Sequence, residues 1–546
     1  MALNENLISV LSHVAEYLNQ NELIDLASTC REIYDKIAIP KLYRRIVINE
    51  EPVMRTNLWY LESYATFVSG YRSVIKSADQ NDIFVYDRIE RLLHSGKLEL
   101  IRELIITDKV FADEDSGFRL FKILIERLVA IDKLEVLQIM DIRLSQIFYE
   151  LYLELTHLKK IHLFDFEDRV QVKSFANCNS LRLMLQNHTS SNSKVISSES
   201  LEFVTHIKEL IVEDVESHTL LFFQNLFEAN IQFPNVNSLK FEHVHTYTSS
   251  ELTTVHINKV IALEKLEKLE MSIACEVPGC HCIDDFLFDL STNLKSLNKL
   301  SLIENTFQTQ GDHYTEENWD ISIAKFILNI PNVSKNLKLL NIDHNPPKNG
   351  EQSNSVDGNY FRRRDLYSKV LPELTALQTL IAPSILLSLS SYDILIGDLL
   401  WNGCKCPFCN KILPILDEYI MNHQVFDNEY SDYKDISVTN FFAYVQQILS
   451  KRIKHQIVWD TDIQNIPPTN KTWDFHGFES ISHFDDYDCT FDNRVFNAVP
   501  IAVAHFFNGY MDNLVVFMPN LSVAILSGIY YSVDKSTRKY KNIYDE

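Results

Sequence analysis

The sequence predicts an α/β fold in which a short N-terminal helical segment precedes a long array of strand–helix repeats and a C-terminal cap. Three observations predict it. Apolar residues recur at helical spacing near the start of the chain, a strand pattern returns repeatedly from residue 101, and aromatic residues are dense after residue 435. At 546 residues, the chain is long enough for several domains or for one long solenoid.

The composition limits the classes of protein to which the chain can belong. Apolar residues make up 46% of it, which favours a packed core, and the net charge of −23 would repel the phosphate backbone of a nucleic acid. The start of the chain lacks the basic stretch of a secretory signal, and no apolar run approaches the ~18 residues of a membrane span. We therefore expect a cytoplasmic protein with no nucleic-acid partner and no membrane insertion.

The sequence lacks the usual signatures of enzymes. The chain has only 12 glycines, and none forms the G-x-G or GxxxxGK[ST] pattern that lets a backbone approach a phosphate. GxSxG, HExxH and kinase motifs are absent as well. We therefore predict that the protein is not an enzyme and has no catalytic residues and no organic cofactor. An enzyme that uses its cysteines is the least favoured alternative.

The first 48 residues are expected to form helices that lead into a strand. Apolar residues of the first helix recur at steps of three and four, and Asn21 is placed to cap a second helix that ends at Pro40. Ile46-Val47-Ile48 is typical of a strand. A segment of about forty residues buries too little surface to be stable alone, so it must pack on the rest of the chain or on another protein.

This N-terminal segment resembles an F-box. The resemblance is carried by Tyr17-Leu18, Cys30-Arg31, Tyr34 and Leu42-Tyr43-Arg44, whereas Asn6-Leu7 and Ser9 replace the family's Leu-Pro start and glutamate. It implies a three-helix F-box that binds a Skp adaptor, which in a complete ubiquitin ligase is linked to a cullin. The residues expected to contact the adaptor are Leu7, Leu11, Val14, Leu18, Leu23, Leu26, Cys30 and Tyr34. The alternative is an ordinary helical cap on the repeat array.

From residue 101 an apolar-x-x-apolar-x-apolar pattern recurs at intervals of about 20 to 40 residues, with helix-like stretches between the copies. This combination predicts an irregular leucine-rich-repeat solenoid, and Pro519-Asn520 indicates a closing strand near the C-terminus. The clearest copies are Ile101/Leu104/Ile106, Leu134/Leu137/Ile139, Leu158/Ile161/Leu163, Ile207/Leu210/Val212, Val236/Leu239/Phe241, Leu266/Leu269/Met271, Leu297/Leu300/Leu302 and Leu337/Leu340/Ile342.

The alternate positions of these strands are expected to face outward on the concave side of the array. Several of them are large and apolar or acidic, which favours a protein partner with a basic patch. The residues predicted to bind the partner are Val136, Met140, Phe164, Glu209, Ile211, Glu213, Glu242 and Glu270. The alternative is a merely solvated strand face.

A cysteine cluster has the spacing of metal ligands. Cys404, Cys406 and Cys409 follow a C-x-C-x-x-C pattern, and His423 comes after a helical stretch. Three thiolates and one imidazole complete a tetrahedral zinc site, so a structural zinc is one interpretation and buried reduced cysteines are the other. A second group, Cys275-x4-Cys280-His281-Cys282, would supply further ligands or form its own site.

The predicted domain boundaries follow from these patterns. They are an F-box over 1–48, a helical linker or cap over 49–100, the leucine-rich-repeat-like solenoid over 101–383, a helical segment with the cysteine cluster over 384–434, and a C-terminal capping region over 435–546. Burying one aromatic ring is worth roughly 1.5–3 kcal/mol, so the aromatic residues of the last region predict a packed cap.

Stretches spread over the whole chain are similar to a fungal family of F-box/leucine-rich-repeat proteins that includes a budding-yeast repressor of a Ypt-type (Rab) GTPase. Among them are 68–74 (VSGYRSV), 86–93 (YDRIERLL), 400–406 (LWNGCKC), 419–424 (YIMNHQ) and 526–530 (LSGIY). The function expected first is that of a substrate receptor in an SCF-type ubiquitin ligase. The alternative implied by the resemblance is a non-ligase F-box protein that inhibits a Rab/Ypt GTPase in endosomal or vacuolar trafficking.

Overall fold

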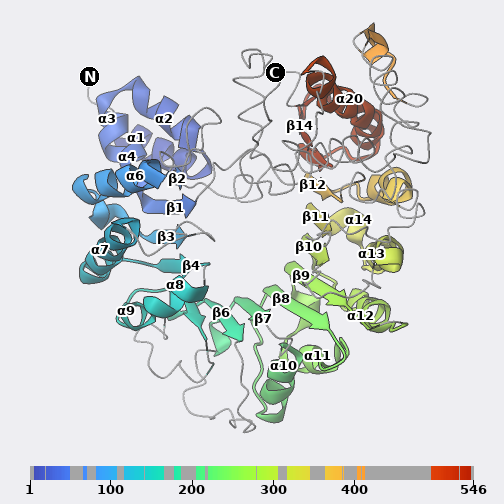
Figure 1. The fold of residues 1–546 in the computed structure, drawn as a ribbon, viewed down its shortest axis with the longest axis horizontal. Coiled ribbons are helices and arrows are strands. Elements are labelled where there is room, and N and C mark those ends of the chain that lie inside the picture. The colour runs from blue at the N-terminus through green and yellow to red at the C-terminus, as the bar shows by residue number, and fades with distance from the viewer. Residues whose placement is uncertain are drawn as a thin grey trace, which may run out of the picture. The chain divides into compact units, whose positions relative to one another are not determined.

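The computed structural model describes residues 5–18, 20–49, 66–69, 82–106, 116–140, 142–164, 166, 177–185, 204–214, 219–277, 279–304, 316–344, 363–383, 385, 403–407, 409–411, 493–527 and 529–542. The chain divides into two compact units, whose elements are labelled in Figure 1. Unit 1 comprises residues 1–184 and 197–207, and unit 2 comprises residues 185–196 and 208–546. The five predicted domain boundaries stay predictions.

Unit 1 begins with a group of short helices. They are α1 (Glu5–Val14), a 3-10 turn (Ala15–Tyr17), α2 (Gln20–Thr29), α3 (Arg31–Ile33), a π-helical turn (Tyr34–Ala38) and α4 (Ile39–Arg44). The prediction that a helix ends at Pro40 was wrong. Pro40 lies in the first turn of α4, which continues directly from the π-helical turn, since Ala38 and Ile39 have helical backbone angles and the N–H of Ile39 donates to the carbonyl oxygen of Tyr34.

A parallel sheet follows in unit 1. Its strands are β1 (Arg45–Asn49), β2 (Thr66–Ser69), β3 (Glu103–Ile106), β4 (Val136–Ile139), β5 (Lys160–Leu163) and β6 (Ser180–Leu185), and their spatial order is β6-β5-β4-β3-β1-β2. The other helical elements of the unit are α6 (Asp82–His94), a 3-10 turn (Leu98–Leu100), α7 (Ser116–Ile131), α8 (Ile142–Ile147) and α9 (Tyr149–Leu153). Helices that alternate with parallel strands indicate right-handed repeat crossovers of the βαβ kind.

Unit 2 repeats this alternation. Its strands β7 (Glu209–Asp214), β8 (Ser238–His245), β9 (Lys268–Cys275), β10 (Lys299–Glu304), β11 (Leu339–His344), β12 (Thr379–Ala382) and β13 (Val523–Leu526) form one parallel row, and β14 (Ile529–Val533) and β15 (Tyr540–Asn542) extend it antiparallel. Its helical elements are α10 (Thr219–Glu228), α11 (Val255–Val260), α12 (Cys282–Ser291), α13 (Glu316–Asn329), α14 (Val333–Asn336), α20 (Asn493–Phe517) and short turns over Leu263–Lys265, Leu366–Val370 and Leu371–Glu373. The closing strand expected after Pro519 is confirmed as β13.

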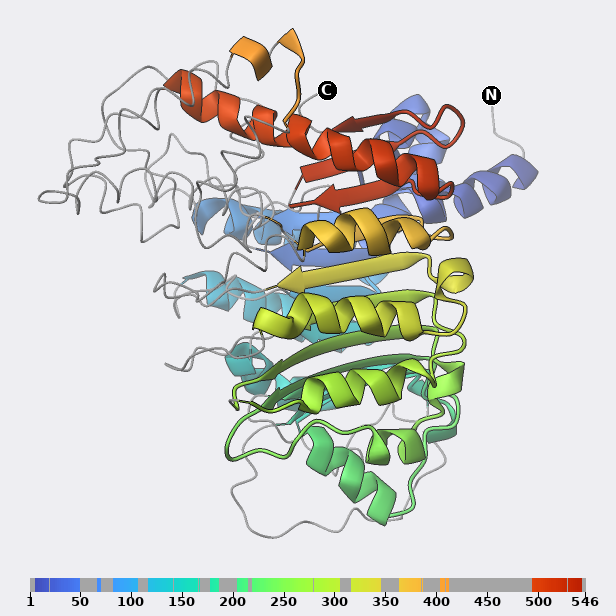
Figure 2. The same ribbon diagram turned by 90° about the vertical axis from the view of Figure 1, so that its right-hand side faces the viewer.

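The apolar positions of the recurring pattern build the core of each unit. In all eight of the clearest copies the three apolar side chains are buried, with exposed fractions of 4% or less. Side chains of a strand alternate between its two faces, so the second and third positions of each copy point to the same side. Figure 2 shows α12 and α13 of unit 2 lying along one face of its strands.

The backbone fixes the register of neighbouring strands. The carbonyl oxygen of Glu267, the residue before β9, accepts hydrogen bonds from the N–H groups of Asn298 (2.9 Å) and Lys299 (3.0 Å) at the start of β10. The carbonyl oxygen of Asn298 accepts from Lys338 and Leu339 in the same way, at 2.8 and 3.1 Å. Because each strand begins at the same level as the one before it, the buried apolar side chains stack in rows.

Of the predicted C-terminal cap over 435–546, the structure describes residues 493–527 and 529–542. Among the aromatic residues of this region that are described, Phe506 and Phe507 of α20 and Tyr531 of β14 are buried, at 7%, 0% and 0% exposure, whereas Phe517 is exposed. Phe507 packs near Tyr367, with ring centroids 6.4 Å apart. Among the described helices, none combines the length and the apolar character that crossing a bilayer requires.

A buried histidine makes the stability of unit 1 sensitive to pH. His162 of β5 is 5% exposed, and its Nδ1 lies 3.4 Å from Ser145 Oγ while its ring centroid lies 5.0 Å from that of Phe164. Burial, followed by the nearby positive charge of Arg182, lowers the pKa of His162 from 6.5 to about 3. The folded chain therefore holds this imidazole neutral at pH values where the unfolded chain would protonate it.

We predict that the free energy of unfolding decreases as pH falls from about 6.5 toward about 3, because between these values the unfolded state binds a proton that the folded state does not. The expected contribution of His162 is a loss of about 1.4 kcal/mol at pH 5.5 relative to neutral pH. Urea unfolding of the wild type and His162→Asn at both pH values measures it. Ser145→Ala keeps the imidazole and should retain the wild-type slope; a His162→Asn slope equal to that of the wild type would contradict the assignment.

Candidate functional site: docking surface and metal centres

The N-terminal helices of unit 1 form a small core of their own. Ala15, Leu23, Ile33 and Ile37 are buried there at 8% exposure or less. The partly buried residues that pack against them are Ile8, Leu11, Leu18, Leu26, Cys30 and Leu42. On α1 and the turn after it, the inward residues 8, 11, 15 and 18 recur at helical steps, so they lie on one face.

A second row of apolar side chains on the same helix faces outward. Leu7, Val10, Val14 and Tyr17 recur at the same steps, displaced by one residue from the inward row, and their exposed fractions are 44%, 59%, 45% and 78%. We call these four residues the apolar stripe. Ile24 of α2 and Tyr34 are exposed as well, at 48% and 46%. Such a concentration of exposed apolar side chains on one short segment is typical of a protein-docking surface.

The structure divides the eight residues expected to contact a Skp adaptor. Leu7, Val14 and Tyr34 are exposed, whereas Leu23 is only 3% exposed and belongs to the local core, where it offers no surface to a partner. Leu11, Leu18, Leu26 and Cys30 are partly buried against that core. The sequence-based set omitted Val10, Tyr17 and Ile24. Each of the three follows or precedes an inward-facing apolar residue by one position, and this displacement is the signal that distinguishes them. Val10 is next to Leu11, Tyr17 to Leu18 and Ile24 to Leu23.

Cys30 has a local structural role. Its backbone is extended (φ −161°), which separates α2 from α3, and its Sγ accepts a hydrogen bond from the N–H of Ile33 at 3.5 Å. The thiol therefore caps the N-terminus of α3 in the way that a serine hydroxyl commonly does. Contact between Cys30 and an adaptor stays a prediction.

The apolar residues predicted to bind a partner in unit 1 contact their own unit. Val136 is buried at 5% exposure, and Met140 and Phe164 are half-buried. Met140 Sδ accepts a hydrogen bond from Gln138 Nε2 at 3.0 Å, and the ring of Phe164 lies 4.9 Å from that of Tyr149. Their partner-binding role stays a prediction.

In unit 2 the predicted partner face carries an ion-pair cluster. Glu209, Ile211, Glu213, Glu242 and Glu270 are half-buried on the strand face opposite the buried leucines. Lys240 Nζ lies 2.8 Å from Glu270 and 4.0 Å from Glu213. Burial alone would lower the pKa of Lys240, but the carboxylates of Glu270 and Glu213 outweigh this and raise the pKa. The cluster neutralises part of the acidic charge and leaves the face net acidic.

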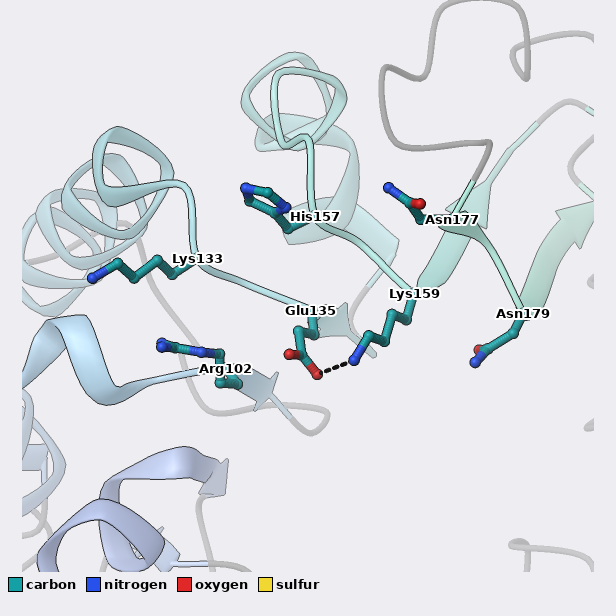
Figure 3. Close-up of a pocket in the computed structure, with 7 residues that line it drawn as sticks. All are labelled: Arg102, Lys133, Glu135, His157, Lys159, Asn177 and Asn179. Atoms are coloured by element: carbon teal, nitrogen blue, oxygen red, sulfur yellow. Dashed lines mark hydrogen bonds and ion pairs between the residues drawn. The ribbon is translucent and has the colours of Figure 1, made fainter. Parts of the chain in front are cut away.

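A polar pocket of about 530 Å³ lies at the amino ends of the strands of unit 1 (Figure 3). Arg102, Glu135, Lys159 and Asn179 line it, each immediately before a strand, together with Lys133, His157 and Asn177. Lys159 Nζ is paired with Glu135 at 2.8 Å, and Lys133 Nζ with Glu99 at 3.0 Å. The lining side chains carry amine, guanidinium, imidazole, amide and carboxylate groups, and the two lysines are paired with glutamates.

The C-x-C-x-x-C cluster of unit 2 meets a histidine from a distant part of the sequence. His505 of α20 places Nδ1 3.4 Å from Cys406 Sγ and 3.2 Å from Cys409 Sγ, and with Cys404 the four ligand atoms lie within 4.8 Å of one another. Within the loop, Cys404 Sγ accepts the N–H of Cys406 and Cys406 Sγ accepts the N–H of Cys409, both at 3.4 Å. We call these four residues the Cys404 centre.

Burial and hydrogen bonding act in opposite directions on these thiols. Burial alone would raise the pKa of Cys406, but hydrogen bonds from the Cys409 backbone and from the side chains around it lower the pKa to about 6. Burial, followed by the hydrogen bond with Cys406, raises the pKa of Cys409. His423, the fourth ligand expected from the sequence, lies outside the described residues. The sequence-based set omitted His505, which is 96 residues beyond Cys409.

A second group of the same composition lies at the ends of β8 and β9 in unit 2. His245, Cys275, Cys280 and Cys282 place their ligand atoms within 4.8 Å of one another. We call these four residues the His245 centre. Of the group suggested by the sequence, the three cysteines take part, whereas His281 is exposed and interacts with Asp284 instead. Both centres present side chains that could hold a metal ion.

Fold and surface together are typical of a protein-interaction scaffold: parallel strand–helix repeats joined to a helical segment with an outward apolar stripe. No protein-family model matches the chain. It is 42% identical over 549 residues to the non-SCF-type F-box protein ROY1 of Saccharomyces cerevisiae, and the match covers 99% of both chains. The chain therefore belongs to the family of F-box proteins similar to ROY1.

This relationship corrects one expectation. The sequence was first interpreted as a substrate receptor of an SCF-type ubiquitin ligase, and the name of this relative, a non-SCF-type F-box protein, contradicts that interpretation. An F-box alone does not distinguish the two cases, since it provides the adaptor-binding helices and leaves the rest of the assembly undetermined.

Proposed function

We propose that this protein is a non-enzymatic F-box protein that binds a Skp-family adaptor through its apolar stripe and inhibits a Rab/Ypt GTPase outside a cullin ligase. The observation that carries the proposal is the outward apolar stripe of α1, on a chain that matches a non-SCF-type F-box protein over 99% of both lengths. The place of action we propose is the cytoplasmic surface of endosomal or vacuolar membranes.

The energetics of the stripe support adaptor binding. Val10 and Tyr17 expose more than half of their surface, and burying that part of each side chain would contribute about 1 kcal/mol or more. Because the inward row of the helix already packs on a core, the stripe does not have to reorganise to bind. A preorganised apolar surface loses little conformational entropy on binding, which favours affinity.

The repeat units support the second half of the proposal. We infer that the strand–helix repeats are an irregular leucine-rich-repeat array and that the strand face of unit 2 binds the GTPase. Ile211 offers an apolar contact, and the surrounding glutamates favour a partner with a basic patch. Lys240 is held in place by its ion pairs with Glu270 and Glu213. It places one positive charge among the negative charges of this face.

We also infer that the Cys404 centre holds a structural zinc. Three thiolates and an imidazole form a usual closed ligand set, and the backbone N–H groups that point to Cys404 and Cys406 stabilise thiolates. Such an ion would link residues 403–411 to α20, two segments that are far apart in the sequence. When bound it would supply folding energy and no activated water, because all four positions are taken by the protein.

For adaptor binding, we expect Val10→Asp and Tyr17→Asp to weaken the affinity of the full chain for a Skp-family adaptor about tenfold or more each, since a charge would be buried in the interface. Isothermal titration calorimetry measures it. Val516→Asp is a matched control, because Val516 is a similarly exposed apolar residue (71%) on α20. Wild-type affinity in both stripe variants would refute adaptor binding by the stripe, and stoichiometric co-purification of a cullin would refute a role outside the ligase.

For GTPase inhibition, we expect the full chain to decrease nucleotide loading of an endosomal Rab/Ypt GTPase, measured with a fluorescent guanine nucleotide. Ile211→Asp should relieve the inhibition about tenfold by placing a charge in the contact. Leu221→Asp, on the exposed side of α10 (50%), should inhibit like the wild type. Unchanged loading in the presence of the wild-type chain would end this proposal.

For the Cys404 centre, we expect Cys406→Ser and Cys409→Ser each to lower the zinc content of the purified chain by one ion and to lower its melting temperature, because the ion stabilises only the folded state. Elemental analysis and thermal unfolding measure the two effects. Cys178→Ser changes a buried cysteine outside both centres and should leave the zinc content unchanged. A Cys406→Ser chain with undiminished zinc would contradict the assignment.

A further inference from the structure

The His245 centre is assembled by the longest strand pair of unit 2. His245 is the last residue of β8 and Cys275 the last residue of β9, and the two are directly paired in the parallel register. Cys282 is the first residue of α12, and Cys280 lies in the loop between β9 and that helix. Gly279 has φ +69°, a backbone conformation that favours glycine, and turns this loop back so that Cys280 reaches the pair.

The contacts at His245 exceed what hydrogen bonding can explain. Its Nδ1 lies 3.2 Å from Cys275 Sγ, 3.4 Å from Cys282 Sγ and 3.5 Å from Cys280 Sγ. An imidazole nitrogen carries either one hydrogen or one lone pair, so it can form one such hydrogen bond and not three. Three sulfurs converging on one nitrogen at nearly equal distances instead outline a site for a central ion.

The dimensions fit a tetrahedral metal. With metal–sulfur and metal–nitrogen bonds of about 2.3 and 2.0 Å, the sulfur and nitrogen ligands of a tetrahedral zinc lie about 3.5 Å apart. The three observed separations of 3.2–3.5 Å match this edge. The four cysteine and histidine atoms also lie within 4.8 Å of one another, and the cysteines are not joined by a disulfide.

Burial makes the site suitable for a structural ion. His245, Cys275 and Cys282 are exposed by 6%, 3% and 5%, and only Cys280 is half-buried. When a divalent ion binds, the three thiols release their protons to solvent and become thiolates. The two positive charges of the ion reduce the net charge of the buried site from −3 to −1. Thiolates with one imidazole select a soft or borderline ion such as Zn²⁺ over Mg²⁺ or Ca²⁺.

An ion here would also account for the length of the two strands. β8 and β9 pair over eight residues, and the described part of β10 pairs with β9 as far as Ile273. Ala274 and Cys275, the last two residues of β9, pair with Val244 and His245 of β8. An ion bound by His245, Cys275, Cys280 and Cys282 would anchor these extended ends to the start of α12.

We propose that the His245 centre binds a second structural zinc ion, independent of the Cys404 centre, that joins the carboxyl ends of β8 and β9 to the N-terminus of α12. The proposal does not depend on adaptor or GTPase binding. It assigns to this part of unit 2 a metal-dependent stability that packing alone would not give.

The test is the zinc content of the full-length chain purified without chelators, measured by elemental analysis. We expect two ions per chain, one for each centre. Cys280→Ser should lower the content to one, Cys406→Ser should lower it to one, and the double variant should hold none. Cys280 is the half-buried ligand in a loop, so its substitution disturbs packing least. Cys280→His supplies another zinc ligand and should restore the second ion.

X-ray absorption at the zinc edge of the Cys406→Ser chain examines the His245 centre by itself. We expect three sulfur neighbours at about 2.3 Å and one nitrogen at about 2.0 Å. The proposal is overturned by a Cys406→Ser chain without zinc, by a Cys280→Ser chain that keeps two ions, or by peptide mapping that finds a disulfide among Cys275, Cys280 and Cys282. Failure of the Cys404 assignment alone would appear differently, as one ion that is lost in Cys280→Ser and kept in Cys406→Ser.

Discussion

The fold depends on the parallel backbone pairing that aligns each strand with the next. A single strand–helix repeat cannot bury its apolar face, so stability comes from stacking in register. In unit 2 the carbonyl before each strand from β7 to β12 accepts two N–H groups of its neighbour, as Glu267 does from Asn298 and Lys299, and this sets the buried rows of the unit at one level. A shift of one residue would turn the buried leucines to the outer face and the glutamates to the core. The charged outer face and the apolar inner face are thus consequences of the same register.

The same separation of roles appears on α1 at a smaller scale. One row of apolar residues holds the helix on its local core, and the row beside it faces outward. Because the rows are displaced by a single position, the helix is apolar over a wide arc, and among the described residues only part of that arc packs on the local core. In the proposed mode of docking, folding and adaptor binding would therefore use different residues of one short helix, so that either could change without loss of the other.

Local patterns in the sequence were sufficient for the strands and insufficient for the sites. The apolar triplets were predicted correctly because burial every second residue is a local signal, and β13 was predicted from Pro519-Asn520 and the residues after it. His505 and His245 were not predicted as ligands because they join their cysteines through tertiary structure, His505 from 96 residues away. The ion pairs of Lys240 with Glu213 and Glu270 bridge three strands and leave no trace in the spacing of any one of them. Leu23 and Val10 are both apolar at helical spacing, and only the packing of α2 on α1 decides which is buried.

The way the parallel row of unit 2 is completed has a consequence for shortened forms of the chain. β12 pairs with β13, whose residues come from far along the sequence: Ser522 Oγ donates a hydrogen bond to Gln378 O, 144 residues before it. A chain truncated between β12 and β13 would contain every earlier repeat and would still lack the strand that pairs with β12. The backbone N–H and C=O groups of Thr379 to Ala382 would then form an open edge, ready to pair with another chain. Premature termination between β12 and β13 is thus expected to yield a chain that self-associates and is degraded, rather than a smaller functional protein.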